Sequence, residues 1–225
     1  MLLMNGCSYG SAWGVEIYPF AQSLGFNSAV NLSKPGSSNS RIIRTTFEYL
    51  QKNAVDFIVL SLTFWDRQEA PWKTFEDYES VWSRYTSMGI PHKTDIAEKS
   101  EFNVYNNYVK NRYLYDISTP YIEKLLLELI FFTAWLDANE YKYIIYSAPG
   151  FCKEDLPSYT KSKFNILARN PRLIDLETFS SNIFMFENGG TSVDKVNPSI
   201  RHYDVTSHRI LYPFLKEYIY KHNLL

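Results

Sequence analysis

Short apolar runs alternate with amphipathic segments along this chain. Five runs are candidates for buried strands, at residues 2–4, 28–32, 56–63, 141–147 and 173–176. The other periodic segments place apolar residues at helical spacing, at residues 15–24, 41–52, 119–138 and 205–220. Strands that alternate with helices predict a parallel sheet with helices on both faces, and therefore an α/β fold.

Capping residues predict where these helices begin and end. Gly25 follows the first helix as a C-cap, and residues 38–40, all Ser or Asn, precede the second as candidate N-caps. Thr119 is the expected N-cap of the third helix, with Pro120 at its first helical position. Asp204 is the expected N-cap of the last helix.

Residues 66–118 depart from this pattern. They are polar and rich in aromatic residues, among them Trp72 and Trp82, and their periodicity is weak. We expect a partly helical insertion that lies over one end of the sheet. The chain shows no internal repeat, so residues 1–225 are interpreted as a single domain that contains this insertion.

Composition excludes several classes of protein. The chain has 23 Lys+Arg against 24 Asp+Glu, and this balance gives no electrostatic basis for binding nucleic acid or an anionic membrane. Two cysteines in 225 residues make neither a disulfide framework nor a metal-type spacing. No secretory signal is evident, and the longest apolar stretch, 125–136, is interrupted by Glu128. We therefore expect a cytoplasmic protein.

Candidate chemistry lies in the loops that follow the first three strands. In parallel sheets ligands bind at the carboxyl ends of the strands, which here carry residues 6–14, 33–39 and 63–67. Ser8 stands in the first of these loops, within Asn-Gly-Cys-Ser, where it is either a turn residue or a nucleophile. A serine nucleophile needs a base. Of the four histidines, His202 lies in a loop that can reach the sheet edge, whereas His208 lies in a helix, where packing roles are common.

Four blocks of the sequence resemble those of the SGNH/GDSL hydrolase family, especially divergent members with Asn-Gly-Cys-Ser. Gly6-Cys7-Ser8 matches Gly-Asp-Ser, and residues 31–39 (NLSKPGSSN) match the second block. Residues 60–63 (LSLT) stand where the third block has Gly-x-Asn. His202-Tyr203-Asp204 followed by Ser207-His208 matches the last block, His-Pro-x followed by Gly-His.

This resemblance implies a flavodoxin-like three-layer α/β/α sandwich and a serine esterase. The nucleophile would be Ser8 and the catalytic histidine His202, with the N–H groups of Ser8 and Gly36 as oxyanion donors. Substrates of the family are often acetyl or acyl esters of carbohydrates or lipids. We expect a small-molecule or saccharide ester as the partner, and the reaction needs no metal or cofactor.

Two positions depart from the family pattern. Ser199 stands where the family has its acid, three residues before the histidine, and Thr63 stands where it has the oxyanion-binding Asn. A Thr63 hydroxyl still donates a hydrogen bond. Either Ser8 and His202 work as a dyad without an acid, or Asp194 or Asp204 takes the place of the acid. Asp204 is the weaker candidate because its expected role as a helix cap occupies its carboxylate.

Other residues near the expected site carry two readings each. Asn39 and Arg41 are candidates to fix the second-block loop or to contact a substrate, although a helix cap and a surface charge explain them nearly as well. Trp65 and Arg67 are candidates for substrate binding, and the alternative for Arg67 is an ion pair with Asp66. Cys7 is either a second nucleophile or, as we favour, a small apolar residue under the turn. The spacing of Gly6, Gly10 and Gly14 matches no nucleotide-binding fingerprint.

The sequence thus supports an esterase first, with two alternatives. The departures at Ser199 and Thr63 are compatible with a catalytically degenerate binding or structural protein on the same fold. Acyl transfer to a sugar instead of water is the third reading, and it requires that the 66–118 insertion keep water out.

Overall fold

The structure is a computed structural model that describes most of the chain outside the insertion. The described residues are 1–11, 17–65, 67, 69–71, 82–84, 118–150, 158–176, 178–191, 203–204 and 206–225. The predictions on His202, Asp194 and Ser199, and most of those on the 66–118 insertion, lie outside these residues.

A four-stranded parallel sheet forms the centre of the molecule, as the apolar runs predict. Its strands are β1 (Leu2–Gly6), β2 (Ala29–Asn31), β3 (Phe57–Leu62) and β6 (Tyr143–Ser147), in the order β2-β1-β3-β6. All three pairings are parallel, with Leu2 opposite both Ala29 and Phe57. The run 173–176 is not a strand: its register with β6 is one isolated bridge, Ile145 to Leu173.

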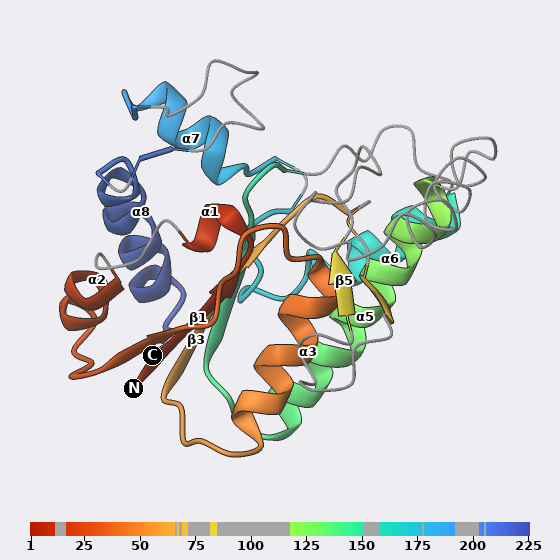
Figure 1. The fold of residues 1–225 in the computed structure, drawn as a ribbon, viewed down its shortest axis with the longest axis horizontal. Coiled ribbons are helices and arrows are strands. Elements are labelled where there is room, and N and C mark those ends of the chain that lie inside the picture. Colours follow the sequence, from red (N-terminus) through yellow and green to blue (C-terminus); the bar gives the residue numbers. More distant parts are fainter. Residues whose placement is uncertain are drawn as a thin grey trace, which may run out of the picture.

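Seven described helices surround the sheet and the loops at its carboxyl end. They are α1 (Ser8–Ser11), α2 (Ile17–Ser23), α3 (Asn39–Leu50), α5 (Ser118–Ala138), α6 (Ser158–Leu167), α7 (Ser181–Glu187) and α8 (His208–Lys221). In Figure 1, α3, α5 and α6 lie on one side of the sheet, and α2 and α8 lie on the other. This arrangement is the predicted three-layer sandwich.

The period-two alternation of a strand divides the core between these two layers. Leu3 of β1 and Ile58 of β3 belong to the cluster that packs with α3, α5 and α6. Leu2 and Phe57 belong to the cluster that packs with α2 and α8. Both faces of the sheet are therefore covered, which explains why its strands read as continuous apolar runs.

Several predicted helix ends are shifted. Ser38 caps α3 as expected, since its side chain accepts from the Arg41 N–H. Thr119 is not an N-cap, because α5 begins one residue earlier at Ser118; Pro120 is accommodated since the first four N–H groups of a helix have no partner within it. Asp204 is not the N-cap of α8, which begins at His208 after Ser207.

The insertion contains two short antiparallel strands among its few described residues. They are β4 (Glu69–Pro71) and β5 (Trp82–Arg84). The sequence indicated partial helix here and did not indicate this pairing. It also gave no sign of α6 or α7. Within the described parts of the chain, no helix combines the length and the apolar character that a membrane crossing requires.

Candidate active site

Ser8 is the first residue of α1, two residues beyond the carboxyl end of β1. Gly6 ends the strand, and a Cβ at this position would lie 3.1 Å from the Cβ of Ser61 and 3.3 Å from the Cα of Gly10. Glycine is therefore what permits the tight turn into α1. Ser8 itself is half-buried, and α1 stands at the carboxyl end of the sheet (Figure 1).

Cys7 lies beneath this turn with no exposed surface, in contact with Ala148 and Phe64. Its thiol occupies the apolar packing position that we favoured over a nucleophilic role. The neighbouring Ser8, in contrast, is partly exposed to solvent.

The loop that carries Gly36 is bonded directly to the turn that carries Ser8. The N–H of Lys34 donates to the carbonyl oxygen of Gly6 at 3.2 Å, and the Asn31 amide donates to the carbonyl oxygen of Gly10 at 3.2 Å. Gly36 adopts a φ of +76°, in the left-handed region that side chains disfavour. The two segments that the resemblance singles out therefore meet at one edge of the sheet.

The loop after β3 is held by Asn39. The oxygen of its carboxamide accepts from the Thr63 N–H at 2.8 Å, and its nitrogen donates to the carbonyl oxygens of Thr63 at 3.0 Å and Phe64 at 3.3 Å. Asn39 is 3% exposed. Its polar atoms are engaged with backbone and covered, which favours a supporting role over contact with a substrate.

Thr63 has no exposed surface. Its N–H is used by Asn39, so its hydroxyl is the only donor it has left for an oxyanion, and this oxygen has no hydrogen-bond partner among the described residues. Trp65 is half-buried and packs against the core on the α5 side. The Arg67 guanidinium lies 5.3 Å from the centre of the Phe64 ring.

Asn5 is a buried polar residue whose role the sequence did not reveal. Its amide nitrogen donates to the Ile42 carbonyl at 3.0 Å and to the hydroxyls of Thr45 and Thr46 at 2.8 and 2.9 Å. Its oxygen accepts from the Gly6 N–H at 2.9 Å. Asn5 thus fixes the strand end before Ser8 to α3. The signal for it was an Asn at the end of an apolar run.

Arg41 is buried, so a surface charge, which was one of its two readings, is wrong. The residue is 3% exposed, and its guanidinium donates to the Ser37 hydroxyl at 3.0 Å. It therefore braces the Gly36 loop from within.

The residues that follow His202 in the sequence are hydrogen-bonded to the segment after α7. The Asp204 N–H donates to the Thr191 carbonyl at 3.0 Å, and the Thr191 N–H donates to the Ser207 hydroxyl at 2.7 Å. The α7 segment is in turn bonded to the end of β6, because the Ser180 hydroxyl donates to the Ala148 carbonyl at 2.7 Å. Residues 203–204 are thereby tied, through α7, to the end of β6.

The carboxylate of Asp204 accepts hydrogen bonds from residues that follow it in the same turn. One of its oxygens accepts from the N–H and hydroxyl of Ser207 and from the Thr206 hydroxyl. Burial raises the pKa of Asp204, but the hydrogen bonds from Ser207 and Thr206 and the nearby His208 outweigh it and lower the pKa below its ordinary value.

His208 is 2% exposed at the start of α8. Its burial lowers the imidazole pKa to about 4, against a smaller opposing effect of Asp204. The side chain is therefore neutral at pH 7.

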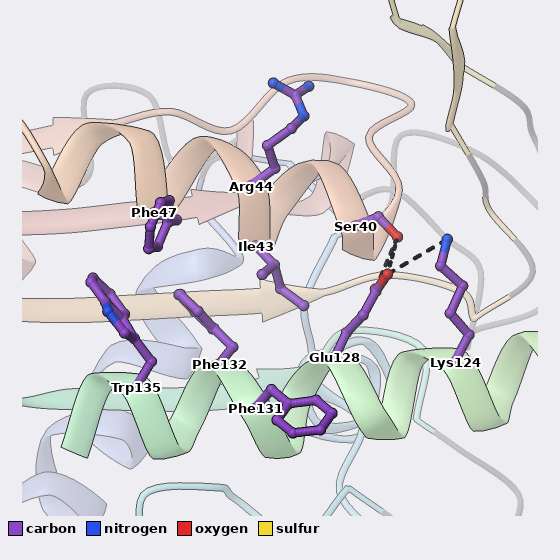
Figure 2. A pocket seen from close by; sticks show the side chains of 9 residues that line it. All are labelled: Ser40, Ile43, Arg44, Phe47, Lys124, Glu128, Phe131, Phe132 and Trp135. Carbon is purple, nitrogen blue, oxygen red and sulfur yellow. Dashed lines mark hydrogen bonds and ion pairs between the residues drawn. The ribbon is translucent and has the colours of Figure 1, made fainter. Parts of the chain in front are cut away.

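A separate groove of about 570 Å³ lies between α3 and α5. Figure 2 shows Phe47, Phe132 and Trp135 at one end of it and a polar group at the other, where the Ser40 hydroxyl donates to the Glu128 carboxylate at 2.9 Å. The described residues that line the groove include none of the predicted site residues.

Comparison with known proteins finds similarity in structure. No protein-family model matches the chain, and no curated protein matches its sequence. The psychrotrophic esterase EstA from Pseudoalteromonas sp., solved with monoethylphosphonate as inhibitor, superposes with a TM-score of 0.51 at 14% identity, over 98% of this chain and 96% of the esterase. A GDSL-like lipase from Bacteroides thetaiotaomicron gives a TM-score of 0.47 at 12% identity, over 98% and 87%. The chain therefore shares the fold of this esterase, and the parallel three-layer α/β/α sandwich that the sequence predicted is confirmed.

Proposed function

We propose that the protein is a serine esterase that hydrolyses an acyl ester, with Ser8 as nucleophile and His202 as base. One observation carries this proposal: the Gly6 carbonyl, two residues before Ser8, accepts from the backbone of the loop that carries Gly36. A candidate nucleophile and a candidate oxyanion donor are thus on loops bonded to each other at the carboxyl edge of the sheet.

In the proposed reaction the Ser8 hydroxyl attacks the ester carbonyl carbon while His202 accepts the hydroxyl proton. The N–H groups of Ser8 and Gly36 stabilise the negative oxygen of the tetrahedral intermediate. The Thr63 hydroxyl is a third donor, which requires that the residues covering it move aside when substrate binds. The C–O bond to the alcohol then breaks, and His202 returns the proton to the leaving alkoxide. Water activated by His202 hydrolyses the acyl-Ser8 ester and releases the acid.

His202 works either in a dyad with Ser8 or with Asp194 as its acid. The substrate class that we favour is an acetylated or acylated saccharide, with specificity contributed by Trp65, Arg67 and the insertion. Aromatic side chains form stacking surfaces for sugar rings, and Arg67 is able to hold an anionic group.

The test is hydrolysis of p-nitrophenyl acetate by the purified protein and by Ser8→Ala and His202→Ala variants. Each variant should lose about 10³-fold or more in kcat/KM. His208→Ala is the matched histidine control and should retain most of the activity. A fluorophosphonate should label Ser8 in the wild-type chain. Equal rates in the wild type, Ser8→Ala and His202→Ala would favour the alternative, a binding protein on the same fold.

A further inference from the structure

We propose that Asn39 is a positioning residue for catalysis, which sets the loop after β3 against the loop that carries Gly36. This inference rests on the proposed esterase function, and it assigns a role to a residue that the substrate does not touch.

The Asn39 carboxamide links these two loops. Both of its ends are used, with the oxygen on the Thr63 N–H and the nitrogen on the carbonyls of Thr63 and Phe64. A buried amide with three backbone partners is held in one orientation. The place of Thr63 relative to α3 is therefore set by this side chain.

The other side of the link is as firmly held. Ser38 caps α3 by accepting from the Arg41 N–H at 3.1 Å, and the Ser37 hydroxyl donates to the Lys34 carbonyl at 2.7 Å. These bonds enclose Gly36 in a short turn that continues into α3. Asn39 consequently joins two braced segments, and under the proposed function each of them presents an oxyanion-binding group.

Loss of this link should slow the chemical step more than it weakens substrate binding. Without the carboxamide, the Thr63 N–H and carbonyl lose partners inside the protein, and the loop after β3 shifts to regain them. Stabilisation of an oxyanion depends on donors that are already in place when the charge develops, so it is sensitive to such shifts. Binding of the ground-state ester does not depend on them in the same way.

The experiment compares Asn39→Ala with Asn170→Ala on p-nitrophenyl acetate. Asn170 is a matched control because its side chain also fixes a loop, donating to the Tyr143 hydroxyl at 2.8 Å and accepting from the Arg172 N–H at 2.9 Å, at the amino end of β6. We expect Asn39→Ala to lower kcat about tenfold or more with KM changed less than about threefold, and Asn170→Ala to leave both within about twofold.

Wild-type kcat in a folded Asn39→Ala variant would overturn the inference, provided that the wild-type rate depends on Ser8. A chain that hydrolyses no ester, or whose rate survives Ser8→Ala, overturns the proposed function instead.

Asn39→Asp provides a second readout and serves if Asn39→Ala does not fold. Its protonated carboxyl both donates to the Thr63 carbonyl and accepts from the Thr63 N–H, whereas the ionised form only accepts. The kcat ratio of this variant to wild type should therefore rise as the pH is lowered through the carboxyl pKa. A ratio that stays constant with pH would contradict the positioning role.

Discussion

The loops around Ser8 and the groove between α3 and α5 use two sides of the same helix in different ways. Toward the sheet, α3 is bonded by Asn5 and by its own Asn39 to the ends of β1 and β3. Toward α5, it contributes Phe47 and Ile43 to an open groove of about 570 Å³ (Figure 2). The first region is small, polar and densely hydrogen-bonded, and the second is wide and aromatic.

This difference teaches that a wide apolar groove need not be a catalytic site. An apolar cavity of a few hundred Å³ fits a ligand by shape. A catalytic site also needs a nucleophile and preorganised donors, and these need a rigid support. In the described part of the chain such support is found at the loops around Ser8. The contrast predicts that buried polar groups there matter for stability, whereas exposed aromatics in the groove do not.

A large effect on stability is expected from Asn5→Leu. Leucine is close in size but leaves the Gly6 N–H and the hydroxyls of Thr45 and Thr46 without their amide partner, in a place that water does not reach. Each such buried group costs about 1–3 kcal/mol, so the free energy of unfolding should fall by about 2 kcal/mol or more. Urea denaturation measures this change.

The control is Asn53→Ala, at the other end of α3. Asn53 also makes a side-chain hydrogen bond, to the Tyr49 carbonyl at 2.9 Å, but it is exposed, so water replaces the lost bond. We expect a change within about 0.5 kcal/mol. If both variants lost the same stability, the burial of Asn5 would not be what makes its bonds important.

A pH effect is expected from His208, and it reaches its full size only at low pH. Its pKa is lowered from 6.5 to about 4 by burial, so the unfolded chain binds a proton that the folded chain does not between these values. This contribution to stability is present above pH 6.5 and is lost as the pH falls toward 4, by up to about 3 kcal/mol.

Because other groups also titrate below pH 6.5, the measurement compares wild type with His208→Gln, which has no proton to gain. Urea denaturation at pH 7, 5.5 and 4.5 should show the wild type losing more stability than the variant. A difference between the two proteins that does not change with pH would mean that His208 titrates near its ordinary value.

The fold could be predicted from the sequence because a buried strand and an amphipathic helix each leave a periodic trace. The strands at 2–4 and 56–63 and the helix at 41–52 were found in this way. The strand predicted at 173–176 is wrong because Leu173, Ile174 and Leu176 are buried, as in a strand, but form only one bridge to β6 instead of a continuous ladder of hydrogen bonds. The helix α6 was missed because it buries only three of its ten residues.

The candidate site could be predicted only in part. A local pattern located Ser8 and the Gly36 loop, and the structure bonds the two segments together. The roles of Asn5 and Asn39 depend on hydrogen-bond partners that are distant in the sequence. Asn5 contacts Thr46, 41 residues away, and Asn39 contacts Phe64, 25 residues away, so no local pattern identifies these partners. The sequence therefore left both substrate binding and loop support open for Asn39, and its buried hydrogen bonds favour the second.

The smallest effect is expected from Phe131→Ala in the groove. The matched control is Phe132→Ala, at the next residue of the same helix. Phe131 is 72% exposed, whereas Phe132 is 6% exposed and belongs to the core cluster between the sheet and α5. Removal of a buried phenyl ring costs about 3–5 kcal/mol because it leaves a cavity, whereas removal of an exposed one changes stability by about 0.5 kcal/mol or less. Urea denaturation of the two single variants should show this difference, and under the proposed function Phe131→Ala should keep the wild-type rate of p-nitrophenyl acetate hydrolysis. A large loss of stability or activity in Phe131→Ala would mean that this face of α5 is covered in solution, and the groove would then belong to an interface or a site rather than to the free surface.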